Sequence, residues 1–486
     1  MSPTKRILKP FPISPARLTV ILVLAAVGFS CSSSRNTDVE RGTDYRYREG
    51  FPEVRMTAIG TINEEGEPGI HVTADIVYGS LIYKSKNEIF RAGITIDVQI
   101  LEEEKNKVVK SQRFNLSVKD KKRSIVTSQE VLTFEKHFLV DPGKYKINVS
   151  VIDRSSNKKT NRATQAVIPN PESEEPTLTS IQMLGMEMDK RRSEFVPVTT
   201  YDVAGRIDSL KFLFMVNKGL KQDTVDIRIR LVKFRSDTTP ARPMSYNTPT
   251  PSSIQYKGIE YDETSEILTN IRRLTVSGSI VIEQSIPNLD RGNYRFEAFI
   301  ENEDGDGEDE FYKAREFSVK SENYPALKSP EELARPLYYL MNEKKYRKLL
   351  QIEDADSLKQ QIDRFWLSNI EDKNTARNVL QLYYERVEQA NKQFSNFKEG
   401  WKTDTGMMYI LFGPPWYVES SLDMMKWSYS YNREDPRYNF LFEMTRIKSQ
   451  FYPFENYLLQ RHSQYYNVEY QQRNLWLSGQ ILNRSI

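Results

Sequence analysis

The chain has 486 residues, which is enough for about three domains of ordinary size. It carries 69 basic and 66 acidic residues, for a formal net charge of +3. This balance gives no electrostatic support for nucleic-acid binding, so no nucleic-acid partner is expected. The single cysteine, Cys31, excludes an internal disulfide, and the folded parts must therefore depend on their hydrophobic cores.

The first 30 residues have the pattern of an export signal. Four basic residues precede the apolar run "LTVILVLAAVGFS" (residues 18–30), which is shorter than the ~20 residues of a spanning helix. Cys31 follows at once, and the segment resembles a bacterial lipoprotein signal peptide. The resemblance implies cleavage after residue 30 and lipidation of Cys31, since several acyl chains give stable anchoring. The polar residues 31–50 are expected to form a tether.

Two regions, residues 51–170 and 177–321, show short runs in which apolar and polar residues alternate. Examples are "ITIDVQI" and "KYKINVSVI" in the first region, and "SLKFLFMV" and "VDIRIRLV" in the second. Such alternation predicts half-buried strands. The sequence therefore predicts two tandem β-sandwiches.

An internal repeat relates the two regions. Each contains Asp-x-Gly-x-Tyr before an alternating strand, at Asp141–Tyr145 and at Asp290–Tyr294. A tyrosine in this position can bury its ring while its hydroxyl bonds nearby backbone, as in a tyrosine corner. The pattern resembles immunoglobulin- or fibronectin-like modules, and this resemblance concerns the fold alone.

Two charged segments have simple structural interpretations. "KDKKR" (residues 119–123) separates two apolar stretches and is expected to be a solvated hairpin turn. "ENEDGDGEDE" (residues 301–310) partly fits a calcium-loop spacing, but Lys313 occupies the closing position that needs an acid. A hairpin tip is expected there, and no metal site or cofactor is expected in the chain.

From residue 324 to 486 the pattern becomes helical and then strand-like. Ser329, Pro330 and Glu332 fit an N-cap, first helical position and capping-box acid, and Pro336 is expected to divide the helix. Helical spacing continues to about residue 395. The runs "MMYILF", "KWSYSY" and "YNFLFEM" then predict strands. The expected fold class is thus two β-sandwiches followed by an α+β domain.

The segment after residue 399 resembles the GWxTD-domain family. Gly400, Trp401, Thr403 and Asp404 match the motif that names the family, with its helical preamble before it and "GPP" (residues 413–415) after it. The resemblance implies an exported bacterial protein, often a lipoprotein with β-sandwich modules in front. The family brings no established activity to carry over to this chain.

The motif has a structural interpretation in which each residue shapes a turn. Thr403 and Asp404 would bond backbone amides, Gly406 would take a positive φ, and Trp401 would fill the core with its N–H bonded. Gly406 and Gly413 would bound a strand. This interpretation needs no ligand.

Catalysis is the alternative interpretation of the motif. Asp404 with Thr403 or Thr405 could act as base and nucleophile, or Asp404 could pair with Glu419 or Asp423 as in a glycosidase. The chain has only three histidines and shows no nucleophile-base-orienter set or metal motif. No catalytic residue is therefore assigned, and the protein is not expected to be an enzyme.

Exposed aromatic side chains of the third domain could contact a partner. Trp416, Tyr417 and Trp427 are the candidates for binding a protein or a glycan, with "PPWYVESS" as the expected exposed loop. The preferred hypothesis for the function of the protein is a lipid-anchored scaffold or accessory subunit of an outer-membrane assembly, with an envelope protein as partner. The alternative is a glycan-binding or glycan-processing lipoprotein. The "SSSRNTD" segment lacks an acidic cluster after Cys31, which favours the periplasmic face over the cell surface.

Overall fold

The computed structural model describes residues 39–40, 50–62, 67–187, 194–276, 278–300, 311–432, 435, 437–446 and 455–483. Residues Asp38–Ile486 form one compact unit, separate from Met1–Thr37. The predicted signal peptide, most of the predicted tether, Cys31 and the predicted hairpin tip at residues 301–310 lie outside the described residues. In the part of the chain that is described, no helix is long and apolar enough to cross a membrane.

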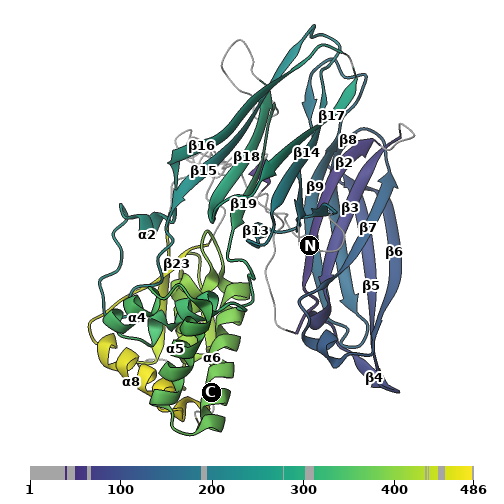
Figure 1. Cartoon of the computed structure of the whole chain (residues 1–486). Helices are drawn as coiled ribbons and strands as arrows, with labels where there is room; N and C mark the ends of the chain where they lie inside the picture. Colours follow the sequence, from purple (N-terminus) through teal and green to yellow (C-terminus); the bar gives the residue numbers. More distant parts are fainter. Residues whose placement is uncertain are drawn as a thin grey trace, which may run out of the picture. The chain divides into compact units, whose positions relative to one another are not determined.

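The first strand-rich part, called sandwich 1 here, has two antiparallel sheets around one core (Figure 1). One sheet has the order β2-β3-β7, and the other has the order β4-β5-β8-β9 with β6 on the far edge of β5. The elements are β2 (Val54–Ile62), β3 (Pro68–Val77), η1 (Tyr78–Ser80), β4 (Lys84–Lys86), β5 (Ile89–Glu102), β6 (Lys107–Asp120), η2 (Arg123–Thr127), β7 (Val131–Leu139), β8 (Gly143–Asp153) and β9 (Lys159–Ile168).

The predicted hairpin at residues 119–123 is wrong. β6 pairs with β5, whereas β7 pairs with β3 in the opposite sheet. The segment therefore carries the chain across the end of sandwich 1, and the short helix η2 buries Ile125 there. Charge and turn-like composition mark a connection but do not say which strands it joins.

The second strand-rich part, called sandwich 2, also has two sheets and its own core. Their strand orders are β1-β19-β18-β15-β16, with β13 beside β19, and β10-β14-β11-β12, with β17 beside β14. The elements are β1 (Val39–Glu40), β10 (Thr177–Leu178), β11 (Gln182–Met186), β12 (Val196–Pro197), β13 (Asp202–Val203), β14 (Ser209–Asn217), β15 (Val225–Ser236), α2 (Ile254–Lys257), β16 (Ile259–Leu274), β17 (Ser279–Pro287), β18 (Gly292–Ile300) and β19 (Tyr312–Val319).

The repeated Asp-x-Gly-x-Tyr segments form matching corners in the two sandwiches. The Tyr145 hydroxyl donates to the Asp141 carbonyl at 2.8 Å, and the Tyr294 hydroxyl donates to the Asp290 carbonyl at 2.7 Å. Both rings are buried. The predicted tyrosine corners are confirmed, and so is the mainly β, then α+β, fold class.

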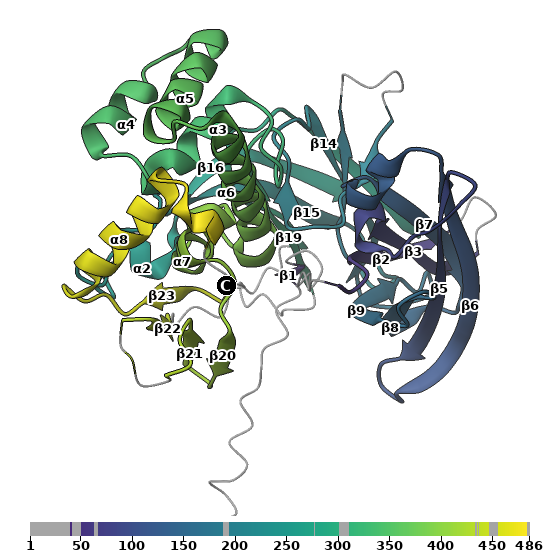
Figure 2. The same ribbon diagram turned by 90° about the horizontal axis from the view of Figure 1, so that it is seen from below.

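The third domain begins with helices and contains a four-stranded sheet of order β20-β21-β22-β23. Helix α7 lies between α6 and this sheet (Figure 2). The elements are α3 (Pro330–Ala334), η4 (Arg335–Tyr339), α4 (Glu343–Leu349), α5 (Ala355–Asn369), α6 (Lys373–Phe394), η5 (Gly400–Lys402), α7 (Asp404–Phe412), β20 (Tyr417–Ser420), β21 (Met424–Ser428), β22 (Asn439–Met444), β23 (Tyr457–Leu459), α8 (Tyr465–Leu477) and η6 (Gln480–Asn483).

The start of this domain agrees with its sequence signals. Ser329 and Glu332 form the predicted capping box, and the helix changes to a tighter turn at Pro336. The predicted strand "MMYILF" is wrong, because residues 404–412 form helix α7. All nine residues of α7 are buried, so the run shows no alternation with polar residues that could separate a buried helix from a buried strand.

The long connection between β15 and β16 belongs partly to the third domain. Ala241 and Met244 from this connection join the third domain's hydrophobic core, and Met244 is 0% exposed. The Met244 amide also donates to Glu469 on α8 at 2.8 Å. Sandwich 2 therefore supplies part of the core on which the GWxTD segment is built.

Candidate functional site

The motif residues form a tight turn that leads into α7. Thr403 caps the helix, with its hydroxyl oxygen accepting from the Gly406 amide at 3.0 Å. The same hydroxyl donates to the Gly400 carbonyl at 2.7 Å. Thr403 thus bonds both sides of the turn, as a threonine N-cap does.

Two glycines of the motif region are required by close backbone approach. A Cβ on Gly400 would lie 1.9 Å from the Ala390 carbonyl oxygen, and one on Gly406 would lie 1.8 Å from the Gly400 carbonyl oxygen. Gly406 is helical, and the predicted positive φ is wrong for it. Gly413 does have a positive φ, of 85°, and ends helix α7 rather than a strand.

Trp401 is buried and fully bonded. Its indole N–H donates to Glu399 at 2.9 Å, and its amide donates to the Asn391 side chain at 3.2 Å. Its carbonyl accepts from the Tyr339 hydroxyl at 2.7 Å. The tryptophan therefore links α6, η4 and the motif turn, which is the core-filling role that the sequence predicts.

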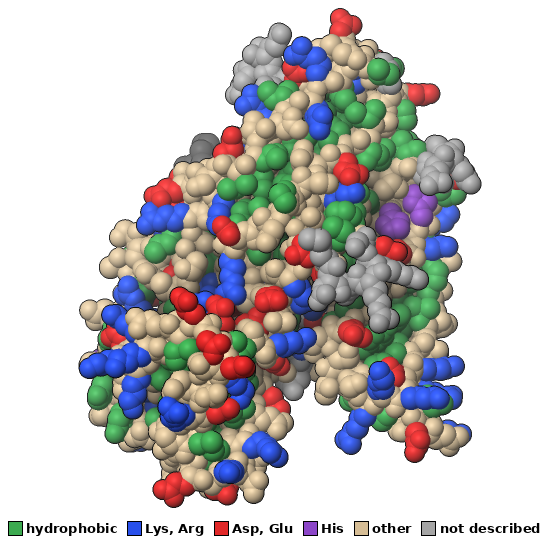
Figure 3. Space-filling model, viewed as in Figure 1, with side chains coloured by type: hydrophobic (Ala, Val, Ile, Leu, Met, Phe, Trp, Pro, Cys, Tyr) green, Lys and Arg blue, Asp and Glu red, His purple; other side chains and the backbone are tan. Residues whose placement is uncertain are grey.

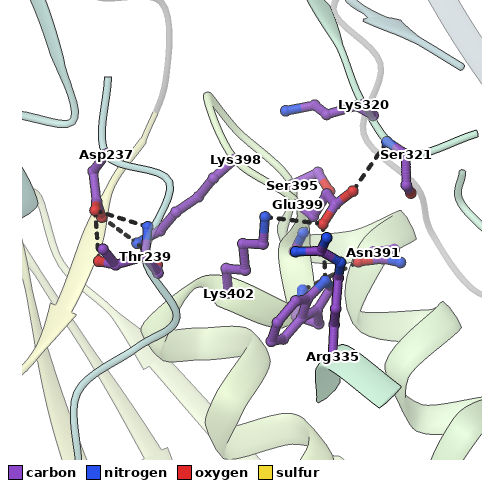
Figure 4. Close-up of polar contacts among 12 residues, drawn as sticks. Asp237, Thr239, Lys320, Ser321, Arg335, Asn391, Ser395, Lys398, Glu399 and Lys402 are labelled. Carbon is purple, nitrogen blue, oxygen red and sulfur yellow. Dashed lines mark hydrogen bonds and ion pairs between the residues drawn. The ribbon is translucent and has the colours of Figure 1, made fainter. Parts of the chain in front are cut away.

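Glu399, directly before the motif, is the centre of a buried polar cluster shared with sandwich 2 (Figure 4). Its carboxylate accepts from the Ser321 amide at 3.0 Å and lies 3.2 Å from the Lys402 ammonium. Nearby, the buried Lys320 ammonium donates to the Asn396 carbonyl at 2.7 Å and lies 3.3 Å from Asp202. Charges buried in this way are stable only when they are paired and hydrogen-bonded.

The cluster shifts the protonation of its members. Burial alone raises the pKa of Glu399, but Lys402 and Ser321 outweigh it and bring the pKa to about 2. Burial lowers the pKa of Lys320, while Asp202 and Glu399 oppose that change. Shifted carboxylates and amines can mark catalytic centres, but here the partners that cause the shifts are structural contacts between two domains.

A second buried pair lies between the same two domains. The Lys398 ammonium bonds Asp237 and the Thr239 carbonyl, both at the start of the β15–β16 connection (Figure 4). The Lys398 and Asp237 side chains are 10% and 1% exposed. The segment before the motif is thus held against sandwich 2 at both ends.

Asp404 is held by Arg461. The two guanidinium N–H groups donate to its two carboxylate oxygens at 2.7 Å each, and the Leu459 amide donates to one of them at 2.7 Å. Arg461 also donates to the carbonyls of Arg242 and Pro243 in the β15–β16 connection. Asp404 does bond a backbone amide, but it is that of Leu459 in β23 and not one within the motif turn as predicted, and the acid also couples the motif to sandwich 2.

This geometry does not supply the proposed catalytic arrangements. Both oxygens of Asp404 are engaged by Arg461. In the described residues, the hydroxyls of Thr403 and Thr405 bond each other and backbone, not an imidazole or carboxylate. The carboxylate of Asp423 binds Arg446, and Glu419 lies on the exposed strand β20. Within the described parts of the chain, no group of His, Cys, Asp and Glu could hold a metal ion.

The aromatic candidates separate into two groups. Trp416 is 36% exposed and Tyr417 is 45% exposed. The centroid of the Trp416 ring lies 4.5 Å from that of Tyr431, a residue that is 84% exposed. Trp427 is 3% exposed and packs on Phe394 and Phe442. The prediction that Trp427 contacts a partner is therefore wrong, because β21 turns this side chain into the core.

Most of the charged residues around the motif have no clear signal in the sequence. Glu399 differs from them because it directly precedes the motif. Lys320 and Asp237 read as ordinary charged residues at strand ends, and Arg461 lies 57 residues after its partner. Only the fold brings them to the motif.

Comparison with known proteins identifies the third domain. Residues 306–478 match the model of the GWxTD domain, so this part of the chain is a GWxTD domain. The match begins before β19, the last strand of sandwich 2, which agrees with the contacts between Ser321 and Glu399. No curated protein matches the chain.

Among solved structures, the native conformation of E. coli alpha-2-macroglobulin is 14% identical over 57% of this chain, with a TM-score of 0.18. Red sea bream transglutaminase is 8% identical over 57%, with a TM-score of 0.17. Fibronectin(III)-like modules of Clostridium thermocellum CbhA are 11% identical over 53%, with a TM-score of 0.13. The chain spans 16%, 32% and 87% of those chains, respectively. TM-scores this low support no argument about fold or function.

Proposed function

We propose that the protein is a lipid-anchored scaffold or accessory subunit of a cell-envelope assembly at the outer membrane. Lipidated Cys31 would attach it to the membrane, with the periplasmic face preferred. The two sandwiches and the GWxTD domain would then present a binding surface to an envelope protein.

One observation carries the proposal: the polar groups of the GWxTD motif are used to hold the chain together. Thr403 closes the motif turn, Asp404 binds Arg461, and Trp401 binds Glu399. Through Glu399 and Arg461 the turn is joined to sandwich 2. The donors and acceptors of this motif are engaged in structural hydrogen bonds. This arrangement fits a rigid domain that displays a binding surface better than it fits a reaction centre.

Crosslinking in intact cells, followed by membrane extraction and affinity isolation, tests the proposal. We expect a defined envelope protein to be recovered with the full chain. The Cys31→Ser variant should lose lipid labelling and membrane recovery. Isolation of the full chain only as a monomer without crosslinked partners would count against a scaffold, and unchanged labelling of the Cys31→Ser variant would exclude the anchor.

Glycan binding is the second candidate, and the exposed ring pair Trp416–Tyr431 favours it. Aromatic rings that stay in solvent offer apolar faces on which sugar rings can stack, whereas most rings of this domain are buried. The candidate predicts that Trp416→Ala abolishes glycan retention. Tyr466→Ala is the matched control, because Tyr466 is 64% exposed on α8. A glycan array without binding by the parent protein would exclude this function.

A further inference from the structure

Sandwich 1 carries a strongly basic end. Residues 84–91 and 119–123 together hold seven cations and only two carboxylates, Glu88 and Asp120. All seven cations are exposed. We call them the basic tip: Lys84, Lys86, Arg91, Lys119, Lys121, Lys122 and Arg123. Figure 3 shows Lys and Arg side chains gathered at the lower end of the molecule where Figure 1 places β4.

Strand pairing places three of these cations in one row. Lys84 on β4 is directly opposite Arg91 on β5, and Arg91 is directly opposite Lys119 on β6. Directly paired residues point to the same face of a sheet, about 5 Å apart, and like charges in such pairs are destabilising. In the described part of the chain, none of the three is paired with a carboxylate.

The row is fixed by a tight turn. Asn87 and Glu88 connect β4 to β5 with φ values of 52° and 59°, the pattern of a two-residue type I′ hairpin turn. A two-residue turn fixes the pairing register of the two strands, so Lys84 must stay opposite Arg91. The charge repulsion is therefore built into the sheet.

A further guanidinium extends the row. Arg154 lies over Gly93, two residues beyond Arg91 on the same face of β5, and a Cβ on Gly93 would meet its Nε at 2.6 Å. Arg154 donates to the Leu116 carbonyl at 3.0 Å, so backbone contacts hold it there. Four cations thus share one face near the basic tip.

Exposed aliphatic side chains lie at the same end of sandwich 1. Ile82 is 47% exposed, and its amide donates to Asp153, the neighbour of Arg154. Val126 is 38% exposed in η2, three residues after Arg123. Cations without counter-charges beside exposed aliphatic residues are typical of surfaces that bind at a membrane interface.

We propose that the basic tip binds the anionic headgroups of a membrane surface, with Ile82 and Val126 entering the interface. The aliphatic residues favour a membrane over a soluble polyanion, which would need only the charges. This contact goes beyond the proposed lipid anchor and does not depend on it.

The test uses residues 38–486, which form one compact unit and lack Cys31. We expect the protein to sediment with vesicles of phosphatidylcholine and phosphatidylglycerol, less so at high salt, and not with phosphatidylcholine alone. Lys84→Gln, Arg91→Gln and Lys119→Gln together should weaken binding on the order of 100-fold, at about fivefold per cation. The control changes Lys344, Lys345 and Lys348 of α4 to Gln, which removes the same charge elsewhere.

Three results would overturn the proposal: equal parent binding to both vesicle types, parent-like binding by the tip variant, or equal weakening by the α4 control. Heparin binding distinguishes the source of the anion. Ile82→Ser with Val126→Ser should weaken vesicle binding and leave heparin binding unchanged. If that variant binds vesicles like the parent while the tip variant loses heparin and vesicles alike, the tip recognises a soluble polyanion instead.

Discussion

Asp404 and Arg461 form a buried bidentate ion pair, in which both N···O distances are 2.7 Å. Their side chains are 5% and 1% exposed. Asp404 ends the family motif, and Arg461 also donates to the Arg242 and Pro243 carbonyls of sandwich 2. The acid of the motif therefore stabilises a junction between domains, with one arginine bonding both sides.

Replacing Asp404 by Asn should strongly destabilise the protein. The amide is nearly isosteric, but it leaves the Arg461 charge buried without its counter-charge. Breaking one side of a buried ion pair costs about 3–5 kcal/mol. Denaturant unfolding at pH 7 measures the loss.

Asp363→Asn is the matched control for Asp404→Asn. Asp363 pairs with Lys359 on the surface of α5, with side chains 44% and 49% exposed. Such surface pairs contribute about 0.3–0.5 kcal/mol. Equal stability changes in the two variants would contradict the role assigned to Asp404.

Met244→Ala should destabilise the third domain although Met244 lies in sandwich 2's connection. The side chain is 0% exposed within the third domain's core, and removing a buried methionine costs about 2–5 kcal/mol. Limited proteolysis should detect faster cleavage within residues 324–483. Met424→Ala, at a position that is 37% exposed, should have little effect and is the control. Slow cleavage of both variants would show that the Met244 side chain from the β15–β16 connection does not stabilise the third domain.

Glu399 should make the protein sensitive to acid. Its folded-state pKa of about 2 lies below its ordinary value of 4.5, so its contribution is present above pH 4.5 and is lost as pH falls toward 2. The shift corresponds to a free energy on the order of 3 kcal/mol. Unfolding curves between pH 7 and pH 2 should therefore show Glu399→Gln less stable at pH 7, with a flatter pH dependence.

The control for this pH effect is Glu343→Gln. Glu343 pairs with Arg347 on the surface of α4, where such a pair contributes little to stability, so this variant should unfold like the parent. Lys320 acts in the same direction in the alkaline range, because its lowered pKa also makes stability rise as pH rises toward the ordinary lysine value of 10.5. Parallel curves for Glu399→Gln and the parent would show that Glu399 does not contribute in the acid range.

The sequence predicts local structure where one physical signal dominates. Alternation identifies strands such as β5 and β15, and the capping box at Ser329 identifies the start of α3. The tyrosine corners follow from a repeated turn and one aromatic residue. In these cases the residues that decide the structure are neighbours in the chain.

The failures have a common cause in tertiary context. Helix α7 is buried all round, so its hydrophobic pattern has no period, and Trp427 points inward because β21 packs on α6 and β22. The Glu399–Ser321 and Asp404–Arg461 contacts join residues 78 and 57 positions apart. A single sequence contains no local signal for such pairs.

Gly406→Ala tests whether close packing or helix propensity determines the effect of a residue at position 406 on stability. Inside an exposed helix, Ala would be more stable than Gly by about 1 kcal/mol. In α7 the new Cβ would lie 1.8 Å from the Gly400 carbonyl oxygen, so the turn must open and release the Thr403 cap. Overpacking of this kind costs about 1–3 kcal/mol, which reverses the sign expected from propensity.

The matched comparison for Gly406→Ala is Gly50→Ala, because Gly50 has a φ of 76° and no atom within 4 Å of an added Cβ. There the cost comes only from the left-handed backbone, about 1–2 kcal/mol. Thermal unfolding of both variants and of each in a Trp401→Phe background, with near-ultraviolet circular dichroism of the tryptophans, separates the two causes, because the background identifies the part of the signal that comes from Trp401. Only Gly406→Ala should change the tryptophan signal, because only it displaces the turn that holds the ring; a stabilised Gly406→Ala protein with an unchanged signal would refute the packing argument.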